Sequence, residues 1–258
     1  MHSQINFGYP WAINYGHLIL ATPFLALFCL GLIFRWRKPI MAVLGLVALW
    51  ALAAFVLVRF GFDMNGRAPL PTQAFLRSGT GKVLDMGAGT GRSTLMVLEA
   101  RPQATVVALD SFTDSYVAHF GDQGTGPVAD QGRARLLANM RAAGVDRRVS
   151  VVAGDMRSMP LPSGSFDAAV SAFAIDHLNS QGIHDALGEA RRVLKPGGDL
   201  LLIVVHKDFW LDVTFGPLMM HSRMVLSNPW DRALRDAGFE IVERGTPPAT
   251  QYVLARKP

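Results

Sequence analysis

One stretch limits the fold of this chain more than any other: Lys82-Val-Leu-Asp-Met-Gly-Ala-Gly-Thr-Gly-Arg92. Its first residues have the apolar character of a buried parallel strand, and residues 93–100 have the pattern of a helix. The glycines between them, Gly87, Gly89 and Gly91, permit a tight turn whose backbone a ligand can approach closely. A strand, a glycine-rich turn and a helix in this order predict a nucleotide-cofactor pocket in an α/β domain.

The spacing of the glycines argues against a dinucleotide cofactor. A dinucleotide fingerprint has its third glycine at the sixth position, whereas here Gly91 comes one place early and Arg92 takes that position. Asp85, just before the turn, would repel a pyrophosphate but would favour a cationic amino-acid group. These features disfavour a nicotinamide-dependent oxidoreductase.

A second carboxylate follows the next apolar run. Residues 105–109 read as a buried strand, and Asp110 ends it. At the tip of the second strand, the Asp110 carboxylate is placed to accept both hydroxyls of an adenosine ribose.

These residues, with Gly154-Asp-Met156, Ser165-Phe-Asp167 and Arg191-Arg-Val-Leu-Lys-Pro-Gly-Gly198, resemble the class I S-adenosylmethionine-dependent methyltransferases. The resemblance covers roughly residues 79–257. It implies S-adenosyl-L-methionine as the cofactor, Asp155 against the adenine amino group, and an apolar contact of Met156 with the adenine ring. A helix-capping role is the alternative for Asp155. The residues that the resemblance places around the cofactor are Asp85, Gly87, Ala88, Gly89, Gly91, Asp110, Ser111, Asp155, Met156 and Ser171.

The remainder of the domain alternates short apolar strands with helical stretches. This alternation predicts a doubly wound α/β sheet, and the resemblance implies the seven-stranded, Rossmann-like form with an antiparallel hairpin at one edge. Strands are expected at residues 83–85, 105–109, 149–153, 168–172, 200–205, 240–244 and 251–255. Helices are expected at residues 93–100, 130–143, 184–193 and 230–237.

Three side chains are candidates for contact with a methyl acceptor. Methyl transfer mainly requires alignment of the nucleophile and exclusion of water, and a base helps where the acceptor begins protonated. Asp176 and His177 follow the fourth strand and His206 ends the fifth, so all three are expected at the ligand-binding rim. For His177 the alternative is packing beside the cofactor, and for His206 it is a structural role or substrate contact. The histidines lack ligand spacing with cysteines, so no metal site is expected.

Two long apolar runs precede the domain. Residues 18–34 and 39–58 carry no charge and flank the basic turn Arg35-Trp-Arg-Lys38. About 20 helical residues cross the hydrocarbon core of a bilayer, which predicts a membrane hairpin with helices at about 12–34 and 39–58. Two buried helices of a soluble domain are the alternative, but neither run has a polar face. We therefore expect a hairpin at residues 1–60, a linker at 61–80 and the catalytic domain at 81–258.

The charge distribution agrees with a lipid surface and not with nucleic acid. The first 62 residues contain four basic and no acidic side chains, while the rest of the chain contains 21 basic and 20 acidic ones. Four of the five net positive charges therefore lie beside apolar segments. Because S-adenosylmethionine is held in the cytoplasm, the domain is expected on the cytoplasmic face of the membrane. The basic turn then lies outside, or snorkels to headgroups from a hairpin that only inserts.

Two further stretches exceed what a small methyltransferase needs. Residues 110–127 are long and glycine-rich, which favours a mobile lid, and residues 209–220 gather large apolar side chains. The second stretch is interpreted as part of the core, as an apolar surface that binds a hydrophobic acceptor, or as a patch that faces a bilayer.

The expected function is a membrane-anchored S-adenosylmethionine-dependent methyltransferase that acts on a lipid-like, hydrophobic or amine acceptor. A phospholipid amine headgroup and an isoprenoid quinone are both candidates. The alternatives are a methyltransferase for a soluble or volatile small molecule and a non-catalytic cofactor-binding scaffold.

Overall fold

The computed structural model describes residues 5–9, 11–112, 128–219 and 229–258 of the chain. These residues form two compact units. One unit contains residues 8–66, and the other combines residues 5–7 with the described part of residues 67–258.

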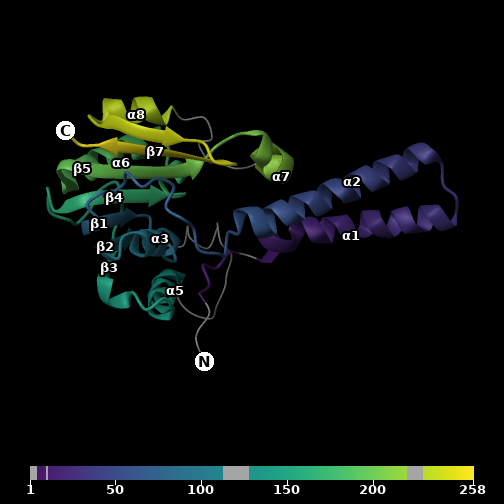
Figure 1. Ribbon diagram of the computed structural model, residues 1–258, viewed down its shortest axis with the longest axis horizontal. Helices are drawn as coiled ribbons and strands as arrows, with labels where there is room; N and C mark the ends of the chain where they lie inside the picture. The colour runs from purple at the N-terminus through teal and green to yellow at the C-terminus, as the bar shows by residue number, and fades with distance from the viewer. Residues whose placement is uncertain (1–4, 10, 113–127, 220–228) are drawn as a thin grey trace. The chain divides into compact units, whose positions relative to one another are not determined.

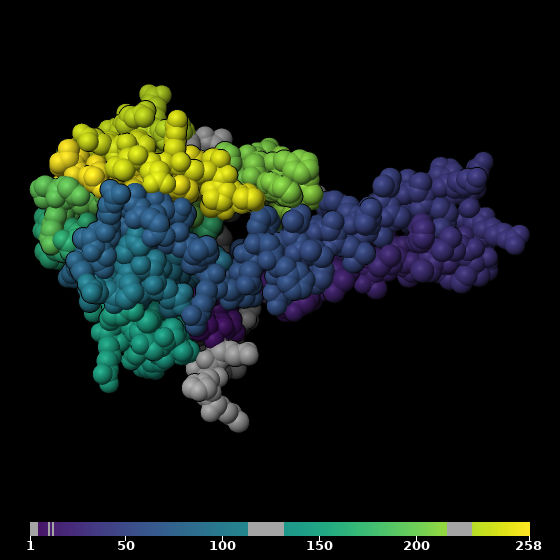
Figure 2. Space-filling model, viewed as in Figure 1, coloured from purple at the N-terminus to yellow at the C-terminus, as the bar shows by residue number. Residues whose placement is uncertain are grey.

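The first unit is a pair of long apolar helices. Helix α1 (Trp11–Ile33) is followed by α2 (Lys38–Val56), which continues into the π-helical segment η1 (Leu57–Phe62). The two helices lie side by side (Figure 2), with Gly31 against Met41 and Gly45 against Phe28. Small residues at such positions let two helices approach closely. Residues 13–33 and 38–62 are each long and apolar enough to cross a membrane, and only 11% and 17% of their apolar windows are buried. The two predicted apolar helices are confirmed.

The second unit is built on a seven-stranded sheet (Figure 1), in the order β3-β2-β1-β4-β5-β7-β6. Strands β1 to β5 are parallel, while β7 runs antiparallel to both β5 and β6. This is the doubly wound sheet with an antiparallel edge hairpin that the sequence predicted. The strands are β1 (Thr80–Met86), β2 (Gln103–Asp110), β3 (Val149–Ala153), β4 (Phe166–Ala172), β5 (Leu194–Val205), β6 (Glu240–Gly245) and β7 (Thr250–Arg256).

Helices cover the sheet and close the core. Side chains from the strands, such as Leu84, Ala169 and Leu202, pack with Leu187 and Trp230 from two of the helices in one buried cluster. The helices of this unit are α3 (Arg92–Ala100), α5 (Val128–Ala142), α6 (Ser180–Val193), α7 (Phe209–Met219) and α8 (Trp230–Asp236), with short 3-10 turns η2 (Asp146–Arg148) and η3 (Ile175–His177).

The second half of the predicted linker packs on the domain. Leu70, Phe75 and Leu76 are buried there. The backbone N–H of Leu76 donates to Asp199 at 2.9 Å, and the guanidinium of Arg101 donates to the carbonyl oxygens of Phe75 and Leu76. The domain therefore holds this segment firmly from about residue 70 onward.

The strand order creates one topological switch point. From β1 the sheet continues to β2 and β3 on one side, and from β4 it continues to β5 on the other. Open α/β sheets bind ligands in the crevice beyond the carboxyl ends of the strands at such a point. The ends of β1 and β4, at Met86 and Ala172, therefore mark the place where a ligand site is expected.

Candidate active site

The glycine turn that follows β1 lies at the switch point and forms the cradle in which we expect a cofactor to bind. Gly87 has a φ of +79°, and a Cβ on it would lie 2.4 Å from Cβ of Ala174 and 2.9 Å from the methyl group of Met156. The backbone N–H groups of Gly87 and Ala88 donate to the carbonyl of Leu109 at 2.8 and 3.1 Å. The end of β2 thus fixes a turn in which only glycine fits at position 87.

The other two glycines shape the start of α3. Gly89 and Gly91 have φ values of +51° and +92°, which favour glycine. A Cβ on Gly91 would lie 2.9 Å from the methyl group of Met140 and 3.1 Å from Cγ of Leu136, both on α5. Gly91 therefore permits close packing of the turn against α5, while Gly87 permits the close approach of Ala174 and Met156 to the turn.

Asp110 presents its carboxylate beside the same turn. One oxygen accepts from the backbone N–H of Gly89 at 2.8 Å, and the other accepts from the N–H of Phe112 at 2.9 Å. Each carboxylate oxygen can accept more than one hydrogen bond, so both remain able to take a ribose hydroxyl. The bare glycine cradle and this carboxylate fit an adenosine-containing cofactor.

Asp85 lies fully buried at the end of β1. Its oxygens accept from the Ser93 hydroxyl at 2.8 Å and from the Thr94 hydroxyl at 2.6 Å, which ties α3 to β1. Burial raises the pKa of Asp85 to about 6, although the hydrogen bonds from Thr94 and Ser93 oppose the rise and the negative charge of Asp110 adds to it. Direct contact between Asp85 and a cofactor stays a prediction.

This buried carboxyl should make both stability and cofactor affinity depend on pH. The folded pKa of Asp85 lies above its ordinary value of 3.8, so the folded state holds a proton that the unfolded chain has lost. Stability should therefore fall as pH rises from about 4 to about 6, by up to about 3 kcal/mol, at 1.36 kcal/mol per unit of pKa. A bound sulfonium nearby favours the ionised form, so S-adenosylmethionine should bind more tightly at pH 7 than at pH 5.

Denaturant unfolding and calorimetry at both pH values measure these two effects. Asp85→Asn should remove the contribution of Asp85 to the pH dependence of stability and should remove the pH dependence of cofactor affinity, while the exposed control Asp146→Asn should retain both. A wild-type dissociation constant that is the same at pH 5 and pH 7 would contradict the assignment of Asp85 to the donor site.

The predicted adenine contacts lie after β3. The methyl group of Met156 faces the Gly87 cradle. The Asp155 carboxylate is engaged by Arg157, whose side chain approaches it at 2.6 Å and whose backbone N–H donates at 2.8 Å, and this pairing holds the pKa of Asp155 below its usual range. The adenine contact of Asp155 stays a prediction, because Arg157 competes for the same oxygens.

Three further residues of the predicted cofactor set have different surroundings. Ser171 is fully buried on β4, and its hydroxyl donates to the carbonyl of Met86 at 3.0 Å, which links β4 to β1. Ala88 is buried in the turn, and Ser111 is exposed beside Asp110. Their contacts with a cofactor stay predictions.

The three predicted acceptor-side residues follow β4 and β5. Asp176, in η3, is 2% exposed; one of its oxygens accepts from the N–H of Val205 at 3.3 Å, and the other has no hydrogen-bond partner among the described residues. Burial raises the pKa of Asp176, and the neighbouring His177 partly opposes the rise. His177 is exposed, while His206 is half-buried after β5 and its backbone N–H donates to Ala249. The structure thus places these residues at the carboxyl ends of β4 and β5.

Two phenylalanines with strained backbone lie on the same rim. Phe112 follows β2 with a φ of +48°, and Phe173 follows β4 with a φ of +52°. A positive φ is unfavourable for a bulky residue and often occurs at functional sites. Phe173 is held by a 2.8 Å hydrogen bond from its N–H to the carbonyl of Ile203, and the next residue, Ala174, faces the cradle. Sequence patterns did not indicate the strained backbone at either position.

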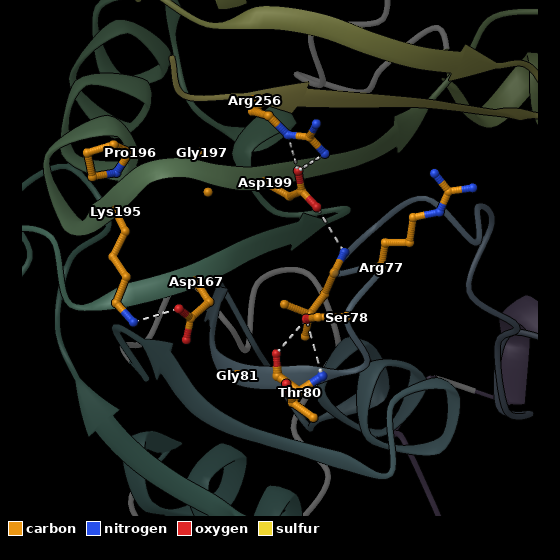
Figure 3. Close-up of a pocket in the computed structure, with 12 residues that line it drawn as sticks. Arg77, Ser78, Thr80, Gly81, Asp167, Lys195, Pro196, Gly197, Asp199 and Arg256 are labelled. Atoms are coloured by element: carbon orange, nitrogen blue, oxygen red, sulfur yellow. Dashed lines mark hydrogen bonds and ion pairs between the residues drawn. The ribbon is translucent and has the colours of Figure 1, made fainter.

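A hollow of about 570 Å³ lies at the amino ends of the strands, opposite the carboxyl rim (Figure 3). Its charged groups are largely paired, Lys195 with Asp167 and Arg256 with Asp199. Thr80 and Gly81, at the start of β1, also line it. Because it sits at the amino ends of β1 and β4, we assign it a structural role in joining the segment before β1 to β5. Residues 113–127 of the predicted lid and the end of the apolar stretch at residue 220 lie outside the described residues.

The fold and the cradle define a class I S-adenosylmethionine-dependent methyltransferase domain. The family described as methyltransferase domain matches residues 84–202, which run from β1 into β5. The expected class and its cofactor, S-adenosyl-L-methionine, are therefore confirmed.

Among curated proteins, the chain is similar to enzymes of quinone biosynthesis. It is 31% identical over 153 residues to the ubiquinone/menaquinone biosynthesis C-methyltransferase UbiE of Syntrophotalea carbinolica, covering 57% of this chain and 53% of that protein. It is 31% identical over 147 residues to the demethylmenaquinone methyltransferase of Thermus thermophilus, covering 57% of each. The chain thus spans about half the length of the curated relatives it matches.

One solved structure with the same fold has a name that describes a different reaction. The [4+2]-cyclase SpnF superimposes with a TM-score of 0.53 at 22% identity, covering 72% of this chain and 78% of that one. Because this fold hosts different chemistries, the reaction has to be argued from the site.

Proposed function

We propose that this protein is a membrane-anchored methyltransferase that transfers a methyl group from S-adenosylmethionine to a hydrophobic acceptor, and that a prenylated quinol is that acceptor. One observation carries the proposal. A single chain combines the glycine cradle and Asp110 with two helices whose apolar side chains are largely exposed. The names of the relatives in quinone biosynthesis support the choice of acceptor class.

The residues at the switch point have separate tasks in binding the donor. Gly87 leaves room for the cofactor, and Asp110 accepts the ribose hydroxyls. The Met156 side chain covers the cradle beside the adenine ring. Bound S-adenosylmethionine supplies an electrophilic methyl group on a cationic sulfonium, and the buried charge of Asp85 favours that cation.

Methylation at a ring carbon requires that the acceptor lose a proton. Asp176 and His177 are the described titratable side chains in η3, beside the ends of β4 and β5. Burial raises the pKa of Asp176 toward neutral pH, and a pKa near the working pH suits a general base. Its other oxygen has no hydrogen-bond partner among the described residues, and we assign it to accept a proton or a hydrogen bond from a phenolic hydroxyl.

The helices give the enzyme access to an acceptor that is confined to a bilayer. Their exposed surface includes Leu20, Leu46, Leu49 and Val56, which a lipid environment would cover. Tethering raises the effective concentration of the domain next to a membrane-resident acceptor. The cofactor is cytoplasmic, so we place the domain on that face of the membrane.

Substitution of Asp176 tests the proposed base. Asp176→Asn should lower kcat by about 100-fold, the usual contribution of general-base catalysis, and should leave the dissociation constant of S-adenosylmethionine unchanged. The drop should be largest below the pKa of the quinol, where the acceptor begins protonated. Asp236→Asn, an exposed carboxylate on α8, is the matched control. Full activity of Asp176→Asn across the pH range would remove Asp176 from the mechanism.

The acceptor class is tested with two quinols that share one demethylated ring. One carries a prenyl tail and is embedded in nanodiscs with the full chain, and the other lacks the tail and is soluble. We expect methylation of the tailed quinol with a kcat/KM at least about tenfold higher, because a bilayer concentrates it near the tethered domain. A preference for the soluble ring would favour a soluble acceptor, and binding of the cofactor without transfer to either would favour a scaffold.

A further inference from the structure

We infer that the carboxyl rim of the sheet docks on the surface of the lipid bilayer, with the aromatic pair Phe209–Trp210 of α7 inserted among the headgroups. The inference rests on the membrane attachment of the proposed function. It adds a second contact with the bilayer, made by the catalytic domain itself.

Helix α7 is fixed at the rim by its own cap. It begins four residues after β5 ends. The carboxylate of Asp208 accepts from the N–H of Leu211 at 2.9 Å and from the N–H of Ala249 at 2.9 Å, so it both caps α7 and ties it to the connection between β6 and β7. On the inner side of α7, the side chains of Leu211 and Thr214 are buried. Figure 2 shows α7, in light green, standing out from the surface of the domain.

The outer side of this anchored helix is apolar. Phe209 is 69% exposed and Trp210 is 40% exposed, and their rings meet edge to face with centroids 5.6 Å apart. Lys207, just before them, is also exposed. Aromatic rings beside a basic side chain are typical of the headgroup region, where the ring is partly in hydrocarbon and the cation meets lipid phosphates. The exposed Asp212 lies in the first turn of α7, where the helix dipole favours it.

A clasp at the amino end of the chain limits the distance between this rim and the bilayer. The carbonyl of Phe7, a fully buried residue, accepts from the Thr90 hydroxyl of the glycine turn at 2.8 Å. The Asn139 side chain accepts from the N–H of Asn6 at 2.9 Å and donates to the carbonyls of Asn6 and Thr90 at 3.0 and 2.9 Å. Residues 6 and 7 are thereby bound to the cofactor turn, on the rim that also carries α7.

The chain is short between this clasp and the first apolar helix. Helix α1 begins at Trp11, four residues after Phe7. Four residues span at most about 14 Å when fully extended. A bilayer that holds α1 therefore has its surface within reach of the carboxyl rim, and this covalent limit favours lipid over a protein partner as the occupant of the α7 surface.

A fluorescent probe on α7 tests the docking directly. The full chain carrying Cys29→Ser and Phe209→Cys is labelled with an environment-sensitive dye and incorporated into nanodiscs that contain anionic lipid. The matched control is Arg77→Cys in the same background. Arg77 is exposed beside the hollow at the amino ends of the strands, opposite the carboxyl rim (Figure 3). We expect a blue-shifted emission and at least about twofold quenching by spin-labelled lipid at position 209, and neither at position 77.

Each other outcome has a defined meaning. An unquenched probe at position 209, on a chain that co-elutes with the nanodisc, overturns the docking and leaves the membrane anchor standing. Shielding that depends on protein concentration and not on the lipid quencher assigns the patch to a second copy or another protein, and also overturns it. A chain that stays out of the nanodisc overturns both the docking and the proposed function.

Enzyme kinetics separates docking from a role of α7 as an acceptor wall. The double substitution Phe209→Ser with Trp210→Ser should raise KM for the tailed quinol about tenfold in nanodiscs, the cost of losing about 1.4 kcal/mol of interfacial contact. In detergent solution the KM should not change. Val242→Ser, which alters an exposed apolar residue on β6, is the control. An equal rise of KM in detergent would show that α7 binds the acceptor itself.

Discussion

Replacement of Gly87 by alanine should lower the affinity for S-adenosylmethionine by about 100-fold or more. Alanine at a φ of +79° costs on the order of 1–2 kcal/mol, and the added Cβ would meet Ala174 at 2.4 Å and Met156 at 2.9 Å. Relief of those contacts requires a shift of Ala174, Met156 or the turn itself, and we expect that shift to distort the cofactor site. Equilibrium binding of the labelled cofactor to the purified full chain measures the loss.

Gly144→Ala is a matched control for backbone strain. Gly144 has a φ of +71°, but a Cβ there meets nothing within 4 Å. This variant should lose about 1 kcal/mol of stability and retain wild-type cofactor affinity. In the Gly87→Ala background, Ala174→Gly removes the closest contacting atom and should restore part of the affinity. Wild-type affinity of Gly87→Ala alone would show that the cofactor binds elsewhere.

Asp110→Ala should reduce cofactor affinity by a similar factor for a different reason. Hydrogen bonds to a charged group contribute about 1.5–3 kcal/mol each, so loss of both ribose contacts is worth about 100-fold or more. The Asp110 carboxylate also accepts from the N–H groups of Gly89 and Phe112, so its removal loosens the turn as well.

An altered ligand separates the ribose contact from the loosened turn. The wild type should bind a ribose-deoxygenated analogue of S-adenosylhomocysteine much more weakly than the parent compound. Asp110→Ala should bind the two equally, because the group that distinguishes them is absent. The exposed carboxylate variant Asp146→Asn should behave as wild type. Discrimination that persists in Asp110→Ala would assign the ribose to another residue.

The sequence predicted the sheet well because its pattern is local. Each expected strand overlaps an observed one, and most of them are short apolar runs bounded by turn residues. Helix α7 was not predicted, because its sequence is largely apolar, with Pro217 near its end, and shows no helical period. Its helical start depends on the cap by Asp208, whose partner Ala249 lies 41 residues away.

Positions in the site were predictable where they depend on topology. The carboxyl ends of parallel strands meet at one edge, so Gly87, Asp110 and Asp176 were correctly expected on a common rim. The contacts of individual side chains were harder to predict from the sequence. The Asp85 carboxylate is held by Ser93 and Thr94 of α3, and the hydroxyl of Ser171 turns inward to β1.

Contacts between residues far apart in the sequence left no readable pattern. Asn139 binds Asn6 across 133 residues, and this pair clasps the start of the chain to the cofactor turn. Ala174 lies against Gly87 because β1 and β4 pair side by side in the sheet. Such contacts arise from tertiary packing, which neither periodicity nor glycine spacing records.

Following a labelled methyl group tests the central claim most directly. The full chain is incubated with methyl-labelled S-adenosylmethionine and either the membrane extract or the soluble metabolite pool of the source cells. We predict that label appears in a solvent-extractable lipid from the membrane fraction, and that Gly87→Ala abolishes it. Label that enters only water-soluble products, or no transfer by a protein that binds the cofactor, would contradict the account.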